Sequence, residues 1–216
     1  MNAKVTQVII LSCVLFFQID VTAQNNEWKT AVSKDGKVTA KYDFTTRLNE
    51  NGDKVPVVNS LATTTVNMDI GNCISLMKDV SRHKDFRGEK SSNLIRTISA
   101  NEWVIYYYND KTLITPAVDG SYSMIFKEDP QHKTATFTIT ADPTLTEKTD
   151  ASRMTYVKEI YSFRELGQNQ LEVTIKTTSS PGFKVPSMLM KKAFPKKLFD
   201  RMEKFIEMAH LENNAK

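Results

Sequence analysis

Alternating apolar and polar side chains mark several β-strands along the chain. In one segment Phe137 and Ile139 alternate with threonines, and in a later one Leu171, Val173 and Ile175 alternate with polar residues. Such period-two alternation buries one face of a strand and leaves the other in water. Turn residues separate the strand segments in pairs, which predicts an antiparallel sheet. The predicted strands are residues 37–45, 55–70, 94–99, 102–108, 121–127, 134–141, 156–164 and 170–177.

Two segments change to helical spacing. Between Gly71 and Asp85 apolar residues recur every three or four positions, which predicts a short helix after the first strand pair. The C-terminal segment predicts a long amphipathic helix that begins near Pro186 and contains Pro195. Because proline lacks a backbone N–H, we expect Pro195 to kink this helix or to divide it in two. Its apolar stripe consists of Leu198, Met202, Phe205 and Ala209, with Phe199 and Ile206 beside it.

The order of elements predicts an α+β fold. One face of the sheet is apolar and needs a cover, and the C-terminal helix is the only predicted element long enough to provide it. We therefore expect a curved antiparallel β-sheet wrapped around a long C-terminal α-helix, with a short helix after the first hairpin. A curved sheet that grips one helix leaves room for a space with an apolar lining between them.

Residues 1–23 have the pattern of a secretory signal peptide. Lys4 gives a positive start, residues 8–17 form an apolar run, and small side chains lead to Ala23. The run is shorter than the roughly 20 apolar residues that a membrane span requires. We therefore expect cleavage after Ala23 and export to the periplasm or the medium.

The expected mature chain, residues 24–216, has a length that suits one domain. An uncleaved membrane anchor is the first alternative, but polar Gln18 and Asp20 follow the apolar run and disfavour it. Lipid attachment at Cys13 is the second, and the apolar run continues past that cysteine. We expect the mature chain to be a monomer.

The net charge is a modest +4 and the pI is near 8.9, so charge alone indicates no class of partner. One basic cluster lies near the C-terminus, and a solvated helix face is the simplest interpretation. Attraction to anionic lipid or to an acidic partner is the alternative. The cluster consists of Lys184, Lys191, Lys192, Lys196, Lys197 and Arg201. Cys73 is the only cysteine after residue 23, and we expect it to be a small buried hydrophobic residue.

The sequence carries no pattern of established catalytic chemistry. His83, His132 and His210 fall on separate predicted elements without the spacing of metal ligands. There is no nucleophile elbow, phosphate loop or dinucleotide fingerprint, and seven glycines leave little material for such loops. Basic and aromatic residues do not interleave as in nucleic-acid-binding surfaces. We therefore expect no catalytic residue, no metal, no cofactor and no nucleic-acid partner.

Four stretches resemble, in their order along the chain, the START lipid-transfer domain superfamily, which has the helix-grip fold. The resemblance covers about residues 28–208. The stretches are Trp28 with residues 34–38, residues 79–86, residues 102–108 followed by Pro116 and Asp119, and residues 181–189 followed by 194–198. Two departures stand out: Phe86 lies where the family often has tryptophan, and Asp119 lacks the neighbouring arginine of the family's Arg-Asp pair. The polar headgroup contacts of better-known family members therefore cannot be transferred to this chain.

The resemblance implies a START domain with an internal hydrophobic cavity, a lid made by the C-terminal helix and nearby loops, and binding or transfer of a lipid. A lipid-transfer role would bring the basic C-terminal helix into transient contact with a membrane. Two alternatives remain open. Related helix-grip folds include enzymes, so the cavity could hold a reaction on a hydrophobic substrate. The second alternative is a protein-interaction module without a cavity.

Aromatic side chains concentrate on the predicted central strands. Ordinary core packing is the first interpretation, but several tyrosines on one sheet also suit an apolar pocket with a few polar anchors. Methionines would add an adaptable lining. The candidate ligand-binding residues are Trp103, Tyr107, Tyr122, Met124, Phe137, Tyr161, Phe163, Leu189, Phe194 and Leu198.

Glu159 lies between Val157 and Tyr161 in a predicted strand and shares their phase. We favour an outward position with a basic partner across the strand. The alternative is that Glu159 or Arg164 anchors the polar end of a ligand.

Overall fold

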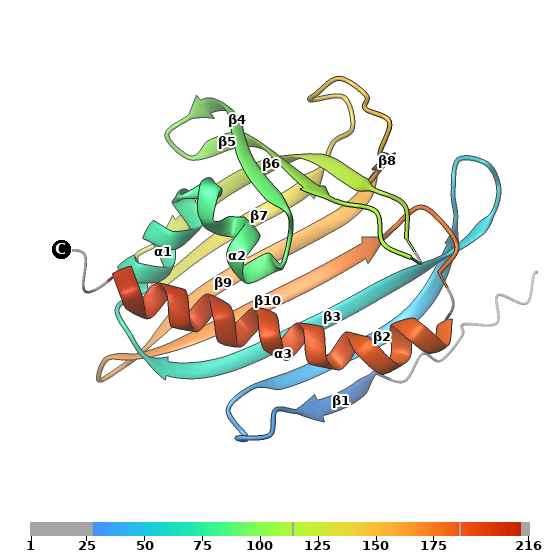
Figure 1. Ribbon diagram of the computed structural model, residues 1–216. Coiled ribbons are helices and arrows are strands. Elements are labelled where there is room, and N and C mark those ends of the chain that lie inside the picture. Colours follow the sequence, from blue (N-terminus) through green and yellow to red (C-terminus); the bar gives the residue numbers. More distant parts are fainter. Residues whose placement is uncertain (1–27, 114, 186, 213–216) are drawn as a thin grey trace, which may run out of the picture.

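The computed structural model describes residues 28–113, 115–185 and 187–212, without the side chains of residues 187–189 and 191–193. The expected signal peptide, residues 1–23, lies outside the described residues, as does Pro186. A large antiparallel sheet curves beneath one long helix (Figure 1). This is the predicted α+β helix-grip architecture.

The sheet has ten strands, of which nine form a continuous path in the order β1-β2-β3-β10-β9-β7-β6-β5-β4. The short β8 pairs in parallel with β6, off this path. The strands are β1 (Lys29–Val32), β2 (Thr39–Leu48), β3 (Lys54–Asn67), β4 (Ser91–Ser99), β5 (Glu102–Asn109), β6 (Val118–Asp129), β7 (Thr134–Ala141), β8 (Ser152–Arg153), β9 (Tyr156–Gly167) and β10 (Gln170–Ser180). All eight predicted strands are present, whereas β1 and β8 were not predicted because four and two residues give no readable alternation.

The predicted first hairpin is confirmed by the antiparallel pairing of β2 with β3, which runs from Thr39 opposite Thr63 to Leu48 opposite Lys54. At the other side of the sheet β4 pairs with β5 less regularly, with register shifts between Leu94 and Arg96 and beyond Thr97. Such bulges twist a strand and interrupt its ladder of hydrogen bonds.

The short helical region consists of three pieces rather than one. Helix α1 (Ile70–Lys78) begins at Asp69, whose side chain accepts a hydrogen bond from the N–H of Gly71. Asp79 has non-helical dihedral angles and ends α1, and a 3-10 turn (Val80–Arg82) then leads into α2 (His83–Arg87). Gly88, in the left-handed conformation at φ 70°, ends α2. The predicted region is thus helical, but its direction changes at Asp79.

Helix α3 (Ser187–Leu211) crosses the concave face of the sheet diagonally (Figure 1). It continues through Pro195 as one helix, so the expected division in two does not occur. The predicted stripe is buried where it faces the sheet, since Met202, Phe205 and Ala209 have no exposed surface. In the part of the chain that the structure describes, no helix is both long enough and apolar enough to span a membrane.

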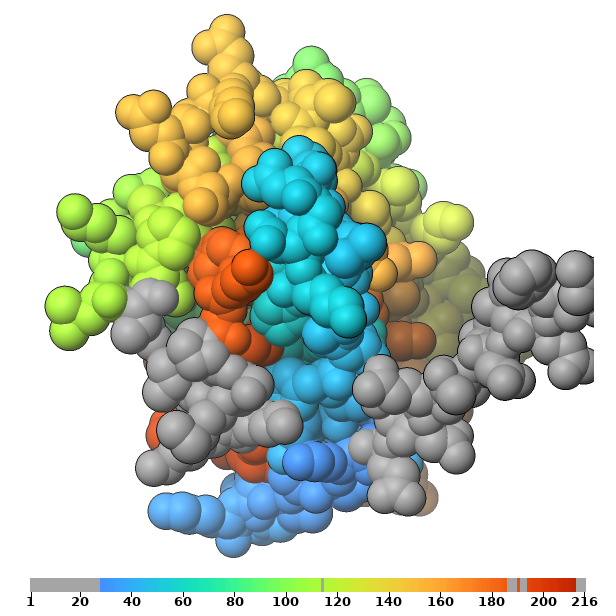
Figure 2. Space-filling model, turned by 90° about the vertical axis from the view of Figure 1, so that its right-hand side faces the viewer, coloured from blue at the N-terminus to red at the C-terminus, as the bar shows by residue number. Residues whose placement is uncertain are grey.

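The turn between β2 and β3 packs against the loop that leads into α3. Asn49 Nδ2 donates a hydrogen bond to the carbonyl of Gly182 at 3.1 Å, and Lys184 pairs with Asp53 at 2.9 Å. Figure 2 shows this end of the molecule, where the cyan β2–β3 turn lies beside the orange segment before α3 and below the yellow-orange loop before β8. These polar contacts connect the β2–β3 turn to the segment that leads into α3.

The aromatic core lies under the C-terminal half of α3. Phe205 stacks on Phe163 with ring centroids 5.8 Å apart and meets Phe86 edge-on at 5.1 Å. Phe137 continues this cluster toward Phe126, at 4.6 Å between centroids. Offset and edge-on aromatic pairs of this kind add to the free energy of burial.

Candidate functional site

One row of side chains across the concave face changes from apolar to polar and back. Its members lie directly opposite one another on neighbouring strands and all are buried. Ser60, Thr177 and Glu159 form the polar middle, on β3, β10 and β9. The complete row is Tyr42, Ser60, Thr177, Glu159, Ile139, Met124 and Trp103.

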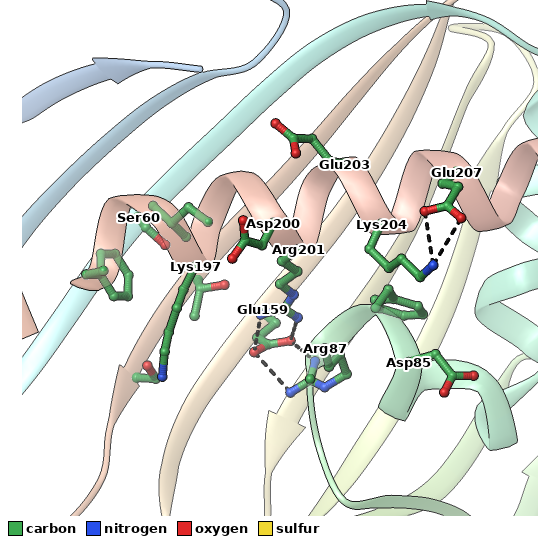
Figure 3. Close-up of a pocket in the computed structure, with 16 residues that line it drawn as sticks. Ser60, Asp85, Arg87, Glu159, Lys197, Asp200, Arg201, Glu203, Lys204 and Glu207 are labelled. Atoms are coloured by element: carbon green, nitrogen blue, oxygen red, sulfur yellow. Dashed lines mark hydrogen bonds and ion pairs between the residues drawn. The ribbon is translucent and has the colours of Figure 1, made fainter. Parts of the chain in front are cut away.

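A groove of about 650 Å³ lies over the polar middle of this row, between α3 and α2. Ser60, Thr177 and Glu159 belong to its floor, and Phe194 and Leu198 of α3 contribute apolar surface. Figure 3 shows Arg201 reaching down from α3 to Glu159, while Arg87 approaches Glu159 from the side of α2. The groove is therefore amphipathic, and two of its arginines meet at one buried carboxylate.

Glu159 is held by two arginines, and we call Glu159, Arg87, Arg201 and Tyr161 the Glu159 cluster. Arg201 donates to both carboxylate oxygens, at 3.2 and 2.6 Å, and Arg87 also donates to both. The hydroxyl of Tyr161 accepts hydrogen bonds from both guanidiniums. Burial alone would raise the pKa of Glu159, but Arg201 and then Arg87 outweigh it and hold that pKa far below its usual range. Glu159 is therefore a structural anion and not a proton donor at neutral pH.

The favoured position of Glu159 was wrong. Only 4% of its surface is exposed, and its partners come from two helices rather than from across the strand. Arg164 lies in the outward phase of β9, where it pairs with the half-buried Glu172 at 2.9 Å, so it cannot share a site with Glu159. The buried position agrees with the phase of Val157 and Tyr161, a signal that was present in the sequence.

A second cavity of about 210 Å³ lies on the other side of the Glu159 cluster and shares Arg87, Glu159 and Arg201 with the groove. Tyr107 and Tyr122 line it, and the guanidinium of Arg87 lies 4.2 Å from the ring centroid of Tyr107. The Glu159 cluster thus separates the two cavities.

Glu89 also borders the smaller cavity and accepts a hydrogen bond from Arg87 at 2.9 Å. Burial raises the pKa of Glu89, and the neighbouring Arg87 only partly offsets this. Arg87 thus pairs with two buried carboxylates, Glu89 and Glu159, and it shares Glu159 with Arg201.

Asp119 has an arginine partner that the sequence did not reveal. Arg153 of β8 donates to both of its carboxylate oxygens at 2.9 Å, and Tyr106 and Thr149 add hydrogen bonds at 2.9 and 2.7 Å. Asp119 has no arginine next to it in the sequence, but Arg153, which is distant in the sequence, supplies the positive charge. These contacts fix the loop between β7 and β9 to the sheet.

His83 lies behind the Glu159 cluster and is fully buried. Its Nδ1 is 2.7 Å from the hydroxyl of Tyr107, and its Nε2 is 2.9 Å from the carbonyl of Met77, so Nε2 carries the proton and Nδ1 accepts. Burial, reinforced by the charge of Arg87, lowers the pKa of His83 to about 3. The neutral ring therefore orients Tyr107. Cys73 is likewise fully buried, as expected, and burial raises the pKa of its thiol to about 12.

The structure distributes the described candidate ligand-binding residues over four environments. Phe194 and Leu198 line the groove, and Tyr107 and Tyr122 line the smaller cavity. Tyr161 contributes its hydroxyl to the Glu159 cluster. The side chain of Leu189 lies outside the described residues. The remaining candidates are packed in the core: Trp103, Met124, Phe137 and Phe163.

Sequence reasoning missed Arg87 and Glu89 and assigned Arg201 to a solvated helix face. Lys184 and Lys196 are exposed as expected. The side chains of Lys191 and Lys192 are not among those that the structure describes. Arg201, by contrast, keeps only 16% of its side chain exposed. It follows Leu198 by three positions, so helical spacing already placed it beside the buried stripe. No cluster of potential metal ligands occurs among the described residues.

Comparison with solved structures relates the fold to lipid-transfer proteins. The STAR-related lipid transfer protein of Xanthomonas axonopodis superposes with a TM-score of 0.68 at 16% identity, over 85% of this chain and 98% of that chain. Human StAR-related lipid transfer protein 5 gives 0.64 at 13% identity, over 85% and 86%. The lipid transfer and protein localization domain of human StarD13 gives 0.60 at 14% identity, over 87% and 88%.

These similarities show that the chain has a START-like helix-grip fold. At the level of sequence, no protein-family model and no curated protein matches it.

Proposed function

We propose that this chain, which has a START-like helix-grip fold, is an exported binding protein that holds a hydrophobic small molecule, a lipid, beneath α3. The observation that carries the proposal is the groove of about 650 Å³ between α3 and the sheet. This volume lies within the range of small-molecule sites. The groove combines apolar side chains with a few buried polar groups, which suits an amphipathic ligand better than a purely apolar one. The lipid-transfer proteins of the same fold support this choice of ligand class.

The driving force for binding is the removal of apolar ligand surface from water, about 25 cal/mol for each Å² buried. Phe194 and Leu198 offer such surface on α3. A ligand reaches the buried floor when the N-terminal half of α3 moves away from the sheet. Arg201 fastens the middle of the helix to Glu159. Pro195 lies between these two parts and is the proposed hinge.

The proposal is tested by native mass spectrometry of the full chain, expressed with its N-terminal segment and purified without detergent. Extraction with organic solvent then identifies any bound molecule. A stoichiometric lipid supports the binding function and names its class. A protein without bound ligand that takes up nothing from a lipid mixture contradicts it and favours the protein-interaction alternative. The intact mass of the same sample also tests cleavage after Ala23.

Transfer between membranes is a separate step of the proposal. It requires the basic part of α3 to meet anionic lipid, where each lysine near the surface contributes about 1 kcal/mol. Lys196 is already paired with Asp200 at 2.6 Å, which leaves the lysines before Pro195 for this role. We expect the double variant Lys191→Glu, Lys192→Glu to lose binding to anionic vesicles. Unchanged vesicle binding would exclude this membrane contact and would not count against ligand binding.

A further inference from the structure

Two buried hydroxyl groups on the floor of the groove have no hydrogen-bond partner within the described part of the chain. Ser60 is 1% exposed and Thr177 is 8% exposed, and the two lie directly opposite each other on β3 and β10. Buried polar groups in native proteins are nearly always satisfied, because an unmade hydrogen bond costs free energy. A pair of unsatisfied hydroxyls on a cavity floor therefore points to a ligand group that reaches both.

The other unsatisfied group at this position is also a donor. Nε of Arg201 is buried and makes no hydrogen bond to the described residues, although the other two nitrogens of the guanidinium bind Glu159. Lys197 extends from α3 toward the floor of the groove and makes no ion pair with a described residue. The hydroxyls can also donate. The missing partner is thus an acceptor.

The acidic residues of the groove do not supply this acceptor. Figure 3 shows Glu203 pointing away from the sheet and Asp85 directed away from Arg201. Glu207 is paired with Lys204, and Asp200 is paired with Lys196. Glu159 already accepts from two arginines. The oxygen acceptor must therefore come from a bound molecule.

We propose that Ser60, Thr177, Arg201 and Lys197 form a subsite for the carboxylate of a fatty-acid-like amphiphile, whose chain lies against Phe194 and Leu198. A carboxylate offers two oxygens with several lone pairs, enough for these donors, and its charge strengthens each hydrogen bond. A doubly charged phosphate fits less well, because Glu159 is the direct neighbour of Thr177 and repulsion grows with charge. The inference rests on the proposed function and names its ligand class.

The experiment compares four probes that separate the headgroup from the chain: palmitate, palmityl alcohol, methyl palmitate and acetate. Each is titrated into the delipidated full chain, with displacement of a fluorescent lipid as the readout. We expect palmitate to bind roughly tenfold or more tightly than the alcohol and the ester, because hydrogen bonds to a charged group are the stronger ones. Acetate alone should not displace the probe, since it lacks the chain.

Variants then assign the preference to the named residues. Ser60→Ala with Thr177→Val removes both hydroxyls at nearly constant volume, and Lys197→Gln removes the charge at an exposed position that folding does not depend on. Each should reduce the ratio of palmitate to alcohol affinity several-fold. The matched controls are Thr174→Val, on the convex face of the same strand, and Lys196→Gln, whose lysine is paired with Asp200. Neither control should change the ratio.

The outcomes distinguish the carboxylate subsite from the proposed lipid-binding function. Equal binding of palmitate and palmityl alcohol overturns the carboxylate subsite but keeps the lipid-binding function. A palmitate preference that survives both groove variants overturns the assignment to these residues. No binding of any chain-bearing probe, together with an empty solvent extract, overturns the proposed function itself.

Discussion

The two halves of α3 cover different parts of the sheet. Under its C-terminal half, Met202 and Phe205 are completely buried, and Phe205 stacks on Phe163. Under its N-terminal half lie Ser60 and Thr177, whose hydroxyls find no partner in the described part of the chain. The same helix thus closes a filled core at one end and a polar groove at the other.

This difference shows how one element can serve stability and binding at once. Close packing supplies the free energy that holds the helix to the sheet, and it leaves no space for a ligand. The groove end retains unsatisfied polar groups, so we expect it to be the end that opens at the lower cost. The Glu159 cluster lies at the boundary between the filled core, which serves stability, and the groove, which serves binding.

The largest expected effect is at the filled end. Phe205→Ala removes a fully buried ring that contacts Phe86, Tyr161 and Phe163, and should cost roughly 4 kcal/mol of unfolding free energy. Phe194→Ala, at the groove end, should cost less than about 2 kcal/mol because its ring is only partly buried. Urea unfolding measures both, and similar losses would contradict the contrast between the two ends.

The boundary is tested by Glu159→Gln. This change leaves two buried guanidiniums without their shared counter-charge, and breaking a buried pair in this way costs about 3–5 kcal/mol. Glu172→Gln is the matched control, since Glu172 pairs with Arg164 on the outer surface and should cost at most about 1 kcal/mol. A loss for Glu159→Gln as small as the control would mean that the cluster does not hold α3 to the sheet.

Acid should weaken the filled end through His83. Its pKa is about 3 in the fold against an ordinary value of 6.5, so below pH 6.5 the unfolded chain takes up a proton that the folded chain does not. Stability due to His83 is complete above pH 6.5 and declines as the pH falls toward 3, by roughly 3 kcal/mol at pH 4. His83→Gln should unfold more easily at pH 7 and lose stability less steeply between pH 6.5 and 4. An unchanged slope of unfolding free energy against pH would exclude His83 as the source.

The smallest effect is expected at an exposed ion pair of α3 that borders the groove. Lys204→Ala removes an exposed pair with Glu207, and such pairs contribute less than about 0.5 kcal/mol. Thermal unfolding in low and high salt checks this, and a loss above about 1 kcal/mol would show that this exposed pair also helps to hold α3 in place.

The fold could be predicted because its main signals are local. Alternation along β7 and β10 and the stripe from Leu198 to Ala209 each belong to one segment and one period. The break at Asp79 was not visible, because apolar spacing continues on both sides of it. Strands as short as β8 exist only because a partner strand holds them.

The site was less predictable because it is assembled from three separate elements. Arg87 comes from α2, Glu159 from β9 and Arg201 from α3, and no pattern within one segment links them. The phase of Glu159 indicated a buried carboxylate, but its partners depend on how the helices cross the sheet. The pairing of Asp119 with Arg153 was hidden for the same reason, since the two residues come from different strands.

The irregular pairing of β4 has a consequence for self-association. The path of the open sheet ends at β1 and β4, and β4 carries the half-exposed aliphatic side chains Leu94, Ile95 and Ile98. A flat edge of this composition would be a template for strand addition by a second molecule. The register shifts around Arg96 instead twist this edge and disrupt its regular row of donors and acceptors. The bulged border therefore protects the protein from edge-to-edge aggregation while it remains an open sheet.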